Sequence, residues 1–180
     1  TIEQGIYGGI PAQGDIFGVA SNAVAKVEEC AQFDFYSGHG LDAAFLGLAQ
    51  ADSHGNVNVS KFGTTIAGSG GFVDIAQSAK MVVYCGTFTT GGLREEVVNG
   101  KLMITQEGRI KKFLKDVEQI SFSARFANEE NQRIVYVTER CVFELGKDGP
   151  VLTEIAPGVD LEKDIIAQME FTPKVAEDLK

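Results

Sequence analysis

Apolar residues along the chain fall into short runs separated by glycine-rich turns, and the runs differ in their periodicity. The clearest is 81–88 (MVVYCGTF), a continuous, β-branched run typical of a strand buried on both faces. Residues 43–52 (AAFLGLAQAD) are also predicted to form a buried strand, and 32–36 (QFDFY) a short one. Val57 and Val59 alternate with polar neighbours, as expected of a half-exposed strand.

Four segments carry the features of helices. In residues 21–31 (SNAVAKVEECA) apolar side chains recur near helical spacing, after a serine and an asparagine that can cap the first turn. Residues 73–79 follow a loop of small residues and are predicted to form a short helix. Residues 111–119 are predicted as another helix, and 159–169 (VDLEKDIIAQM) as a closing helix with Asp160 as its N-cap.

Two turn signals predict antiparallel hairpins. Asn99-Gly100 lies between two apolar segments, and the segment 146–149 (GKDG) lies between two strand-like runs. Because helices and strands alternate first and antiparallel pairs follow, the sequence predicts an α/β layered domain with a mixed sheet. Residues 81–85 and 44–49 are expected in the buried centre of that sheet. No internal repeat or linker divides the chain, so residues 1–180 are expected to form a single domain.

The charge balance limits the partners that the chain is expected to have. The formal net charge is −9, which argues against broad nucleic-acid binding because such binding needs a basic surface. Arg109, Lys111, Lys112 and Lys115 form a local basic cluster, which we interpret as the solvated face of a helix. No apolar run approaches the ~20 residues that span a bilayer, and no signal peptide is recognisable, so we expect a cytoplasmic protein without membrane contacts.

Cysteine and histidine are too few and too scattered to predict a metal site. Cys30, Cys85 and Cys141 are widely spaced, odd in number and without a CxxC pair, which is typical of reduced thiols in a cytosolic protein. His39 and His54 are the only histidines, and neither has a second ligand at metal-binding spacing.

Three familiar site patterns are weak or absent. Neither histidine is accompanied by a GxSxG sequence that would support a Ser–His–Asp triad, and no GxxxxGK[ST] phosphate loop occurs. Residues 38–43 (GHGLDA) fit the GxGxxA pattern of dinucleotide-binding folds. However, the next segment is predicted as a strand where that fold needs a helix, and residues 57–61 lack the acidic residue expected about 20 positions on.

The most suggestive polar residue is Glu3, which precedes the glycine-rich segment 5–14 (GIYGGIPAQG). A carboxylate is ionised at neutral pH, so it needs no general base to attack an activated acyl group. That attack places negative charge on the acyl oxygen, which backbone N–H groups of a glycine turn can stabilise. The segments 5–11 and 68–72 (GSGGF) offer such turns. A glutamate near a chain terminus is more often a solvated charge, and the residues alone leave both interpretations open.

Several longer segments together carry a family resemblance. EQGIYGGIPAQG, QFDFYSGHGLDAAFLGLAQAD, GNVNVSKFG, AGSGGFVDIAQSAK and VVYCGTFTTGGL, then ERCVFEL and EIAPGVDLEKDIIAQM, occur in the order and spacing of class I coenzyme A (CoA) transferases. The chain resembles the glutamate-bearing, C-terminal half of these enzymes, in particular the single-chain acetate/propionate type with broad short-chain acyl specificity. The resemblance implies an α/β layered domain whose mixed, largely parallel central sheet is flanked by helices and antiparallel hairpins.

The resemblance also assigns roles to individual residues. Glu3 occupies the place of the catalytic glutamate that attacks the acyl-CoA thioester, and Gly71 that of the glycine whose N–H stabilises the oxyanion. Gly8, Gly9 and Gly70 are expected to contact CoA, a substrate that becomes covalently bound as a glutamyl-CoA thioester. No metal and no other cofactor are implied.

The implied activity is ping-pong transfer of CoA between short-chain acyl-CoA and free carboxylic acids. The expected partners are these substrates, the N-terminal half of the same enzyme, and further copies in a homo-oligomer. Two other functions remain open from the residues themselves. One is a non-catalytic α/β domain that binds a sugar phosphate or another effector, and the other is a module that serves only assembly. Replacing Glu3 by glutamine would leave effector binding intact but would abolish the transferase.

Overall fold

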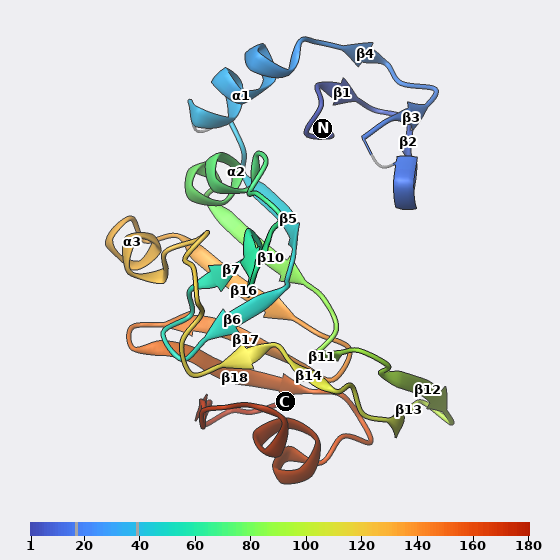
Figure 1. Ribbon diagram of the computed structural model, residues 1–180, viewed down its shortest axis with the longest axis vertical. Helices are drawn as coiled ribbons and strands as arrows, with labels where there is room; N and C mark the ends of the chain where they lie inside the picture. Colours follow the sequence, from blue (N-terminus) through green and yellow to red (C-terminus); the bar gives the residue numbers. More distant parts are fainter. Residues whose placement is uncertain (17, 39) are drawn as a thin grey trace.

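A six-stranded sheet forms the centre of the computed structural model, which describes residues 1–16, 18–38 and 40–180 (Figure 1). Its strands lie in the order β19-β18-β17-β16-β10-β5. Their bounds, in that order, are Lys174–Val175, Gly149–Ile155, Cys141–Gly146, Arg133–Val137, Met81–Cys85 and Ala43–Gly47. β10 pairs in parallel with β16 and β5, and β18 with β19, whereas β16, β17 and β18 pair antiparallel. The predicted mixed, largely parallel sheet is confirmed.

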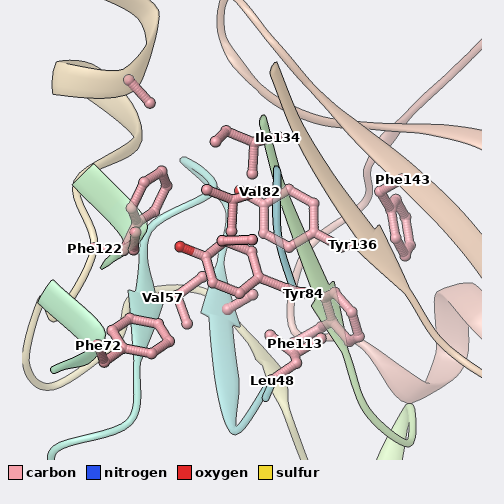
Figure 2. Packing of buried hydrophobic residues seen from close by; sticks show 14 of the residues in the cluster. Leu48, Val57, Phe72, Val82, Tyr84, Phe113, Phe122, Ile134, Tyr136 and Phe143 are labelled. Atoms are coloured by element: carbon pink, nitrogen blue, oxygen red, sulfur yellow. The ribbon is translucent and has the colours of Figure 1, made fainter. Parts of the chain in front are cut away.

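The hydrophobic core is built around aromatic side chains (Figure 2). Tyr84 of β10 is fully buried and packs against Phe72, Phe122 and Tyr136, with ring centroids between 5.4 and 5.8 Å apart. Offset and edge-on ring pairs of this kind add to the gain from removing their apolar area from water. Val82 and Tyr84 have no exposed area, which confirms β10 as a strand of the core. The prediction of burial on both faces is wrong, because Met81 and Val83 on the other face are half-buried and Cys85 is exposed.

Short elements surround this sheet. Helix α2 (Phe72–Ser78), which confirms the helix predicted over 73–79, packs against β5, and α3 (Ala124–Glu129) precedes β16 (Figure 1). A small sheet has the order β15-β6-β7, with bounds Phe113–Leu114, Gln50–Asp52 and Val57–Asn58. The paired strands are β8 (Lys61–Phe62) with β9 (Thr65–Ile66), β11 (Thr89–Thr90) with β14 (Ile110–Lys111), and β12 (Arg94–Val98) with β13 (Lys101–Gln106).

The described residues of segment 1–28 form an arm at one end of the molecule, apart from the six-stranded sheet (Figure 1). In this arm β1 (Ile6–Tyr7) pairs with β4 (Ala25–Lys26), β2 (Ile10–Pro11) pairs with β3 (Ala20–Ser21), and η1 (Gly14–Ile16) is a single 3-10 turn. Helix α1 (Glu29–Ser37) follows the arm and packs against α2. The arm is therefore connected to the rest of the molecule mainly through α1.

The helix predicted over 21–31 is wrong for residues 21–28, whose backbone makes hydrogen bonds with the start of the chain, and only residues 29–31 belong to a helix, α1. The N–H of Val24 donates to the carbonyl oxygen of Tyr7 at 2.8 Å, and the N–H of Val27 donates to that of Gly5 at 2.9 Å. These bonds extend the β1–β4 pair and leave no helical ladder.

The strand predicted over 32–36 is also wrong, since this segment lies within α1. Gln32 and Tyr36, four residues apart, are both buried on one face of that helix. Two aromatic residues at alternate positions made the segment resemble a strand, but the contact of this face with the arm and with α2 stabilises the helix.

The apolar run 43–52 divides into β5 and β6. The expectation that 44–49 lies in the centre of the sheet is wrong, because β5 is the edge strand and Phe45 is 72% exposed. Hydrophobic periodicity cannot distinguish a central strand from an edge strand whose side chains line a cavity.

The basic cluster does not form a solvated helix face, and the helix predicted over 111–119 is wrong. Residues 110–114 form β14 and β15. Lys112 is buried, and its Nζ donates to the carbonyl oxygen of Thr87 at 2.7 Å, while Nζ of Lys111 donates to two carbonyls of segment 167–169. Burial lowers the pKa of Lys112, although the charge of Glu139 acts in the opposite direction. The lysines thus stabilise loop carbonyls.

Both predicted hairpins are confirmed. Asn99 and Gly100 both have positive φ, 52° and 75°, as a tight turn between twisted strands requires. The segment 146–149 joins β17 to β18.

The closing helix is shorter than predicted. It consists of a π-helical turn, η2 (Leu161–Ile165), and a 3-10 turn, η3 (Ile166–Gln168). Asp160 is its N-cap, as predicted, and accepts from the N–H of Lys163 at 2.8 Å. Among the described helices, none combines the length and apolar character needed to cross a bilayer.

Candidate active site

Glu3 lies in a tight turn at the start of the chain. The N–H of Gly5 donates to the carbonyl oxygen of Ile2 at 3.0 Å, which closes the turn, and Ile2 also bridges to Ile6. Both isoleucines are buried and anchor the turn. Gly5 has φ of 86°, and a Cβ there would overlap the carbonyl oxygen of Val27, so only glycine fits. The turn presents the half-buried Glu3 side chain.

Gly71 is the immediate partner of this carboxylate. Its N–H donates to Oε1 of Glu3 at 3.0 Å, across 68 residues of sequence. A Cβ on Gly71 would lie 2.7 Å from that oxygen and would overlap the ring of Phe33 in α1. A Cβ on the neighbouring Gly70, whose φ is 52°, would lie 3.7 Å from the same oxygen. The absence of side chains at both positions therefore leaves room for the carboxylate.

Glu3 stands at a cavity of about 860 Å³ between the arm, α2 and the edge strand β5. This is within the usual size range for small-molecule sites. The lining is largely apolar and consists of Thr1, Ile2, Glu3, Pro11, Tyr36, Leu41, residues 43–49, Val59, Gly68, Ser69, Phe72, Ile75 and Cys85. The apolar side chains of β5 therefore face a cavity that also holds an ionisable carboxylate.

Gly8 and Gly9 do not line this cavity. They have φ of 66° and 78°, and close packing within the arm accounts for their lack of a side chain. A Cβ on Gly8 would lie 2.7 Å from the side chain of Val24, and one on Gly9 would lie 2.5 Å from the carbonyl oxygen of Ser21. The structure thus brings Glu3, Gly70 and Gly71 together and leaves the other two glycines in the arm.

Two contributions to the site were not predicted from the sequence. The first comes from α1, which alternating aromatic residues made resemble a strand: Tyr36 lines the cavity, and Phe33 packs against Gly71. The second is Cys85, which lines the cavity at the end of β10. Among the described residues, no group of three or more His, Cys, Asp and Glu side chains could hold a metal ion. His39, part of the GxGxxA pattern, lies outside the described residues, and His54 is exposed, 3.9 Å from Asp116.

Comparison with known proteins gives close relatives along the whole chain. No family model matches it. Over 180 residues it is 49% identical to the acetate CoA-transferase YdiF of Escherichia coli K12, and over 185 residues it is 51% identical to the caffeate CoA-transferase of Acetobacterium woodii. The chain spans about a third of the length of these relatives, 34% and 35%, which is less than the half that the resemblance implied.

Solved structures agree with these matches. The apoenzyme of the acyl-CoA transferase YdiF from E. coli O157:H7 superposes with a TM-score of 0.94 and 48% identity over all of this chain and 34% of that one. Its thioester complex with CoA gives a TM-score of 0.93 with 47% identity. The glutaconate CoA-transferase of Acidaminococcus fermentans, 16% identical, shares the fold over 98% of this chain with a TM-score of 0.69.

The fold and the paired carboxylate and backbone N–H define an α/β domain that holds a carboxylate at a cavity. From end to end, this chain is homologous to a segment of the CoA-transferases.

Proposed function

We propose that the protein containing this chain transfers CoA between acyl-CoA thioesters and free carboxylic acids, with Glu3 as the nucleophile. The observation that carries this proposal is the hydrogen bond from the Gly71 N–H to the Glu3 carboxylate at the cavity. Relatives at about half identity are named CoA-transferases, and one solved relative is a thioester complex with CoA. No observation favours effector binding or a purely structural role.

The reaction proceeds in two half-reactions. An Oε atom of Glu3 attacks the acyl carbon of the thioester, and the C–S bond breaks to give an acyl-glutamyl anhydride and CoA thiolate. The thiolate then attacks the glutamyl carbon and displaces the first carboxylate, which leaves a glutamyl-CoA thioester. A second carboxylate runs the same two steps in reverse, so that it leaves as acyl-CoA and Glu3 is regenerated.

The residues around Glu3 favour these steps electrostatically. Each attack creates a tetrahedral oxyanion, and the Gly71 N–H is a fixed donor that can stabilise it. The apolar side chains of the lining reduce the water next to the anhydride and thioester, and full exclusion of water requires the rest of the protein to close the open side of the cavity. No proton has to be transferred, because nucleophile and leaving groups are all anions.

Several parts of the proposal concern the complete protein. The remaining two thirds of the polypeptide is expected to close the open side of the cavity and to contribute contacts to CoA. In this chain, Gly70 is still proposed as a residue that contacts CoA. We propose short-chain acids as substrates, although relatives of nearly equal identity are named for acetate and for caffeate. Cytoplasmic location and homo-oligomeric assembly belong to the same proposal.

Trapping the covalent intermediate tests this function. The complete protein is treated with acetyl-CoA without acceptor acid, reduced with borohydride and mapped by peptide mass spectrometry. Reduction of a glutamyl thioester to the alcohol is expected at Glu3 alone and should be absent in Glu3→Gln. Glu154→Gln, which alters an exposed carboxylate on β18, is the matched control and should react normally. An unmodified Glu3 in a protein that still exchanges CoA would refute the proposal.

A further inference from the structure

A buried amide joins the start of the chain to α1. Gln32 has no exposed area, and its side chain lies between two tyrosine hydroxyls. The hydroxyl of Tyr7 donates to Oε1 of Gln32 at 2.6 Å, and Nε2 of Gln32 donates to the hydroxyl of Tyr36. The Tyr36 hydroxyl in turn bonds Oγ1 of Thr1 at 2.5 Å. Since Tyr36 accepts from Gln32, its own proton is free to be donated to Thr1.

This chain of hydrogen bonds encloses the Glu3 turn. Thr1 and Tyr7 lie on either side of the turn in sequence, and both are bonded to one face of α1. In the described part of the structure, three side-chain hydrogen bonds join residues 1–7 to the residues beyond 28. They are the bonds of Thr1 and Tyr7 and the bond between Glu3 and Gly71.

The same helix also positions the donor. Phe33, next to Gln32, stands against Gly71 so closely that a Cβ there would overlap its ring. Phe33 packs edge-on against Tyr36, with ring centroids 5.5 Å apart and an interplanar angle of 79°. α1 therefore bonds the residues on either side of the Glu3 turn, Thr1 and Tyr7, and packs the ring of Phe33 against Gly71.

We propose that Gln32, Tyr7 and Tyr36 form a positioning network that holds the Glu3 carboxylate against the Gly71 N–H. This inference rests on the transferase function proposed above. A buried polar group must have partners, and a fully partnered network fixes one arrangement where apolar side chains would allow several. Apart from the Glu3–Gly71 bond, the network supplies the side-chain hydrogen bonds that join the described residues 1–7 to the chain beyond residue 28, so it determines where the nucleophile lies. A displacement of about 1 Å can lower an enzymatic rate ~10²-fold.

The test uses Gln32→Met, Tyr36→Phe and Tyr7→Phe in the complete protein. Each removes hydrogen bonds while nearly preserving volume. The expected result is a fall in kcat of ~10-fold to ~10²-fold, with KM changed by less than about threefold, because position and not uniform binding is lost. The double variant Gln32→Met/Tyr36→Phe should be no slower than Gln32→Met, since members of one network are not additive.

Tyr136→Phe is the matched control, because it removes a buried hydroxyl that bonds the carbonyl oxygen of Gly55, outside the cavity lining. It should lower the melting temperature and leave kcat unchanged. If Tyr36→Phe and Tyr7→Phe also lower the melting temperature without lowering kcat, the network serves only stability and the inference is wrong. This test holds even if Gln32→Met does not fold. Independent, multiplicative effects of Gln32→Met and Tyr36→Phe would also overturn the inference. Glu3→Gln distinguishes failure of this inference from failure of the proposed function, since an active Glu3→Gln variant would refute the transferase mechanism itself.

Discussion

The backbone N–H of Gly71 donates to Oε1 of Glu3 at 3.0 Å. In the free protein this bond fixes the position of the carboxylate. When that carboxylate attacks an acyl carbon, its negative charge passes to the acyl oxygen, and a donor beside the reacting oxygen is placed to stabilise it there. One N–H can thus bond the nucleophile before attack and the oxyanion after it. Variants that change the distance between Glu3 and Gly71 therefore test the mechanism.

Gly71→Ala is expected to lower the rate of thioester formation by ~10²–10³-fold, the scale for loss of one oxyanion donor. The new methyl group would overlap the Phe33 ring and approach Glu3 Oε1 to 2.7 Å, so the N–H must move. Single-turnover kinetics with acetyl-CoA measures the effect. Gly100→Ala is the control, since it strains the β12–β13 turn, where φ is 75°, but has open space around it. A normal rate for Gly71→Ala would remove the donor from the mechanism.

Glu3→Asp is expected to retain the charge but lose most of the activity. Removing one methylene withdraws the carboxylate by about an ångström from the acyl carbon, and such a misplacement can cost ~10²-fold in rate. Steady-state kcat in the complete protein checks this, with circular dichroism to show that the variant is folded. Activity near that of the unaltered protein would mean that the carboxylate need not be held at a fixed position.

Glu107→Gln is expected to destabilise the fold in a pH-dependent way. Partial burial opposes ionisation of Glu107, but hydrogen bonds from Arg140 and Thr89 and the charge of the fully buried Arg140 outweigh it, so the pKa of Glu107 is lowered. A lowered pKa stabilises the folded state above the ordinary carboxyl pKa of about 4.3, and this contribution is lost as pH falls through the folded-state value. We expect a loss of about 1–3 kcal/mol at neutral pH, the scale of hydrogen bonds to charged groups.

Urea unfolding near neutral pH and near pH 4 measures this difference, which should shrink at the lower pH. Glu144→Gln breaks the exposed ion pair with Arg133 and should change stability by less than about 1 kcal/mol. An equal loss of unfolding free energy for both variants would show that burial of Arg140 does not strengthen its ion pair with Glu107.

Thiol labelling is expected to divide the three cysteines. Burial raises the pKa of Cys141 to about 12, so this thiol should resist iodoacetamide until the protein unfolds. Cys30 and Cys85 are exposed in this chain and should react. Because Cys85 lines the cavity, acyl-CoA should slow its labelling relative to Cys30, as mass spectrometry of the peptides can measure. Equal protection of both thiols would place CoA elsewhere.

The sequence by itself determined the features whose causes are local. Asn99-Gly100 specifies its turn because these two residues tolerate positive φ, and Asp160 begins the closing helical turn because its side chain accepts from Lys163. Residues 81–85 form a strand of the core because a continuous β-branched run fits little else. Glu3 was a candidate because of the glycine-rich segment that follows it, but only family resemblance favoured a nucleophile over a solvated surface residue.

The tertiary structure decided everything that depends on partners distant in sequence. Residues 21–28 have helical spacing, yet the N–H groups of Val24 and Val27 bond the opening segment. Residues 32–36 lie in a helix because Gln32 and Tyr36 face the arm together. The run 43–49 lines a cavity although β5 is at the sheet edge, and Lys112 can be buried because the carbonyl oxygen of Thr87 accepts a hydrogen bond from its Nζ. Glu3 meets Gly71 across 68 residues, where α1 bonds Thr1 and Tyr7 on either side of the Glu3 turn and packs Phe33 against Gly71. Local propensities differ by less than such contacts contribute, so the long-range partner determines the outcome.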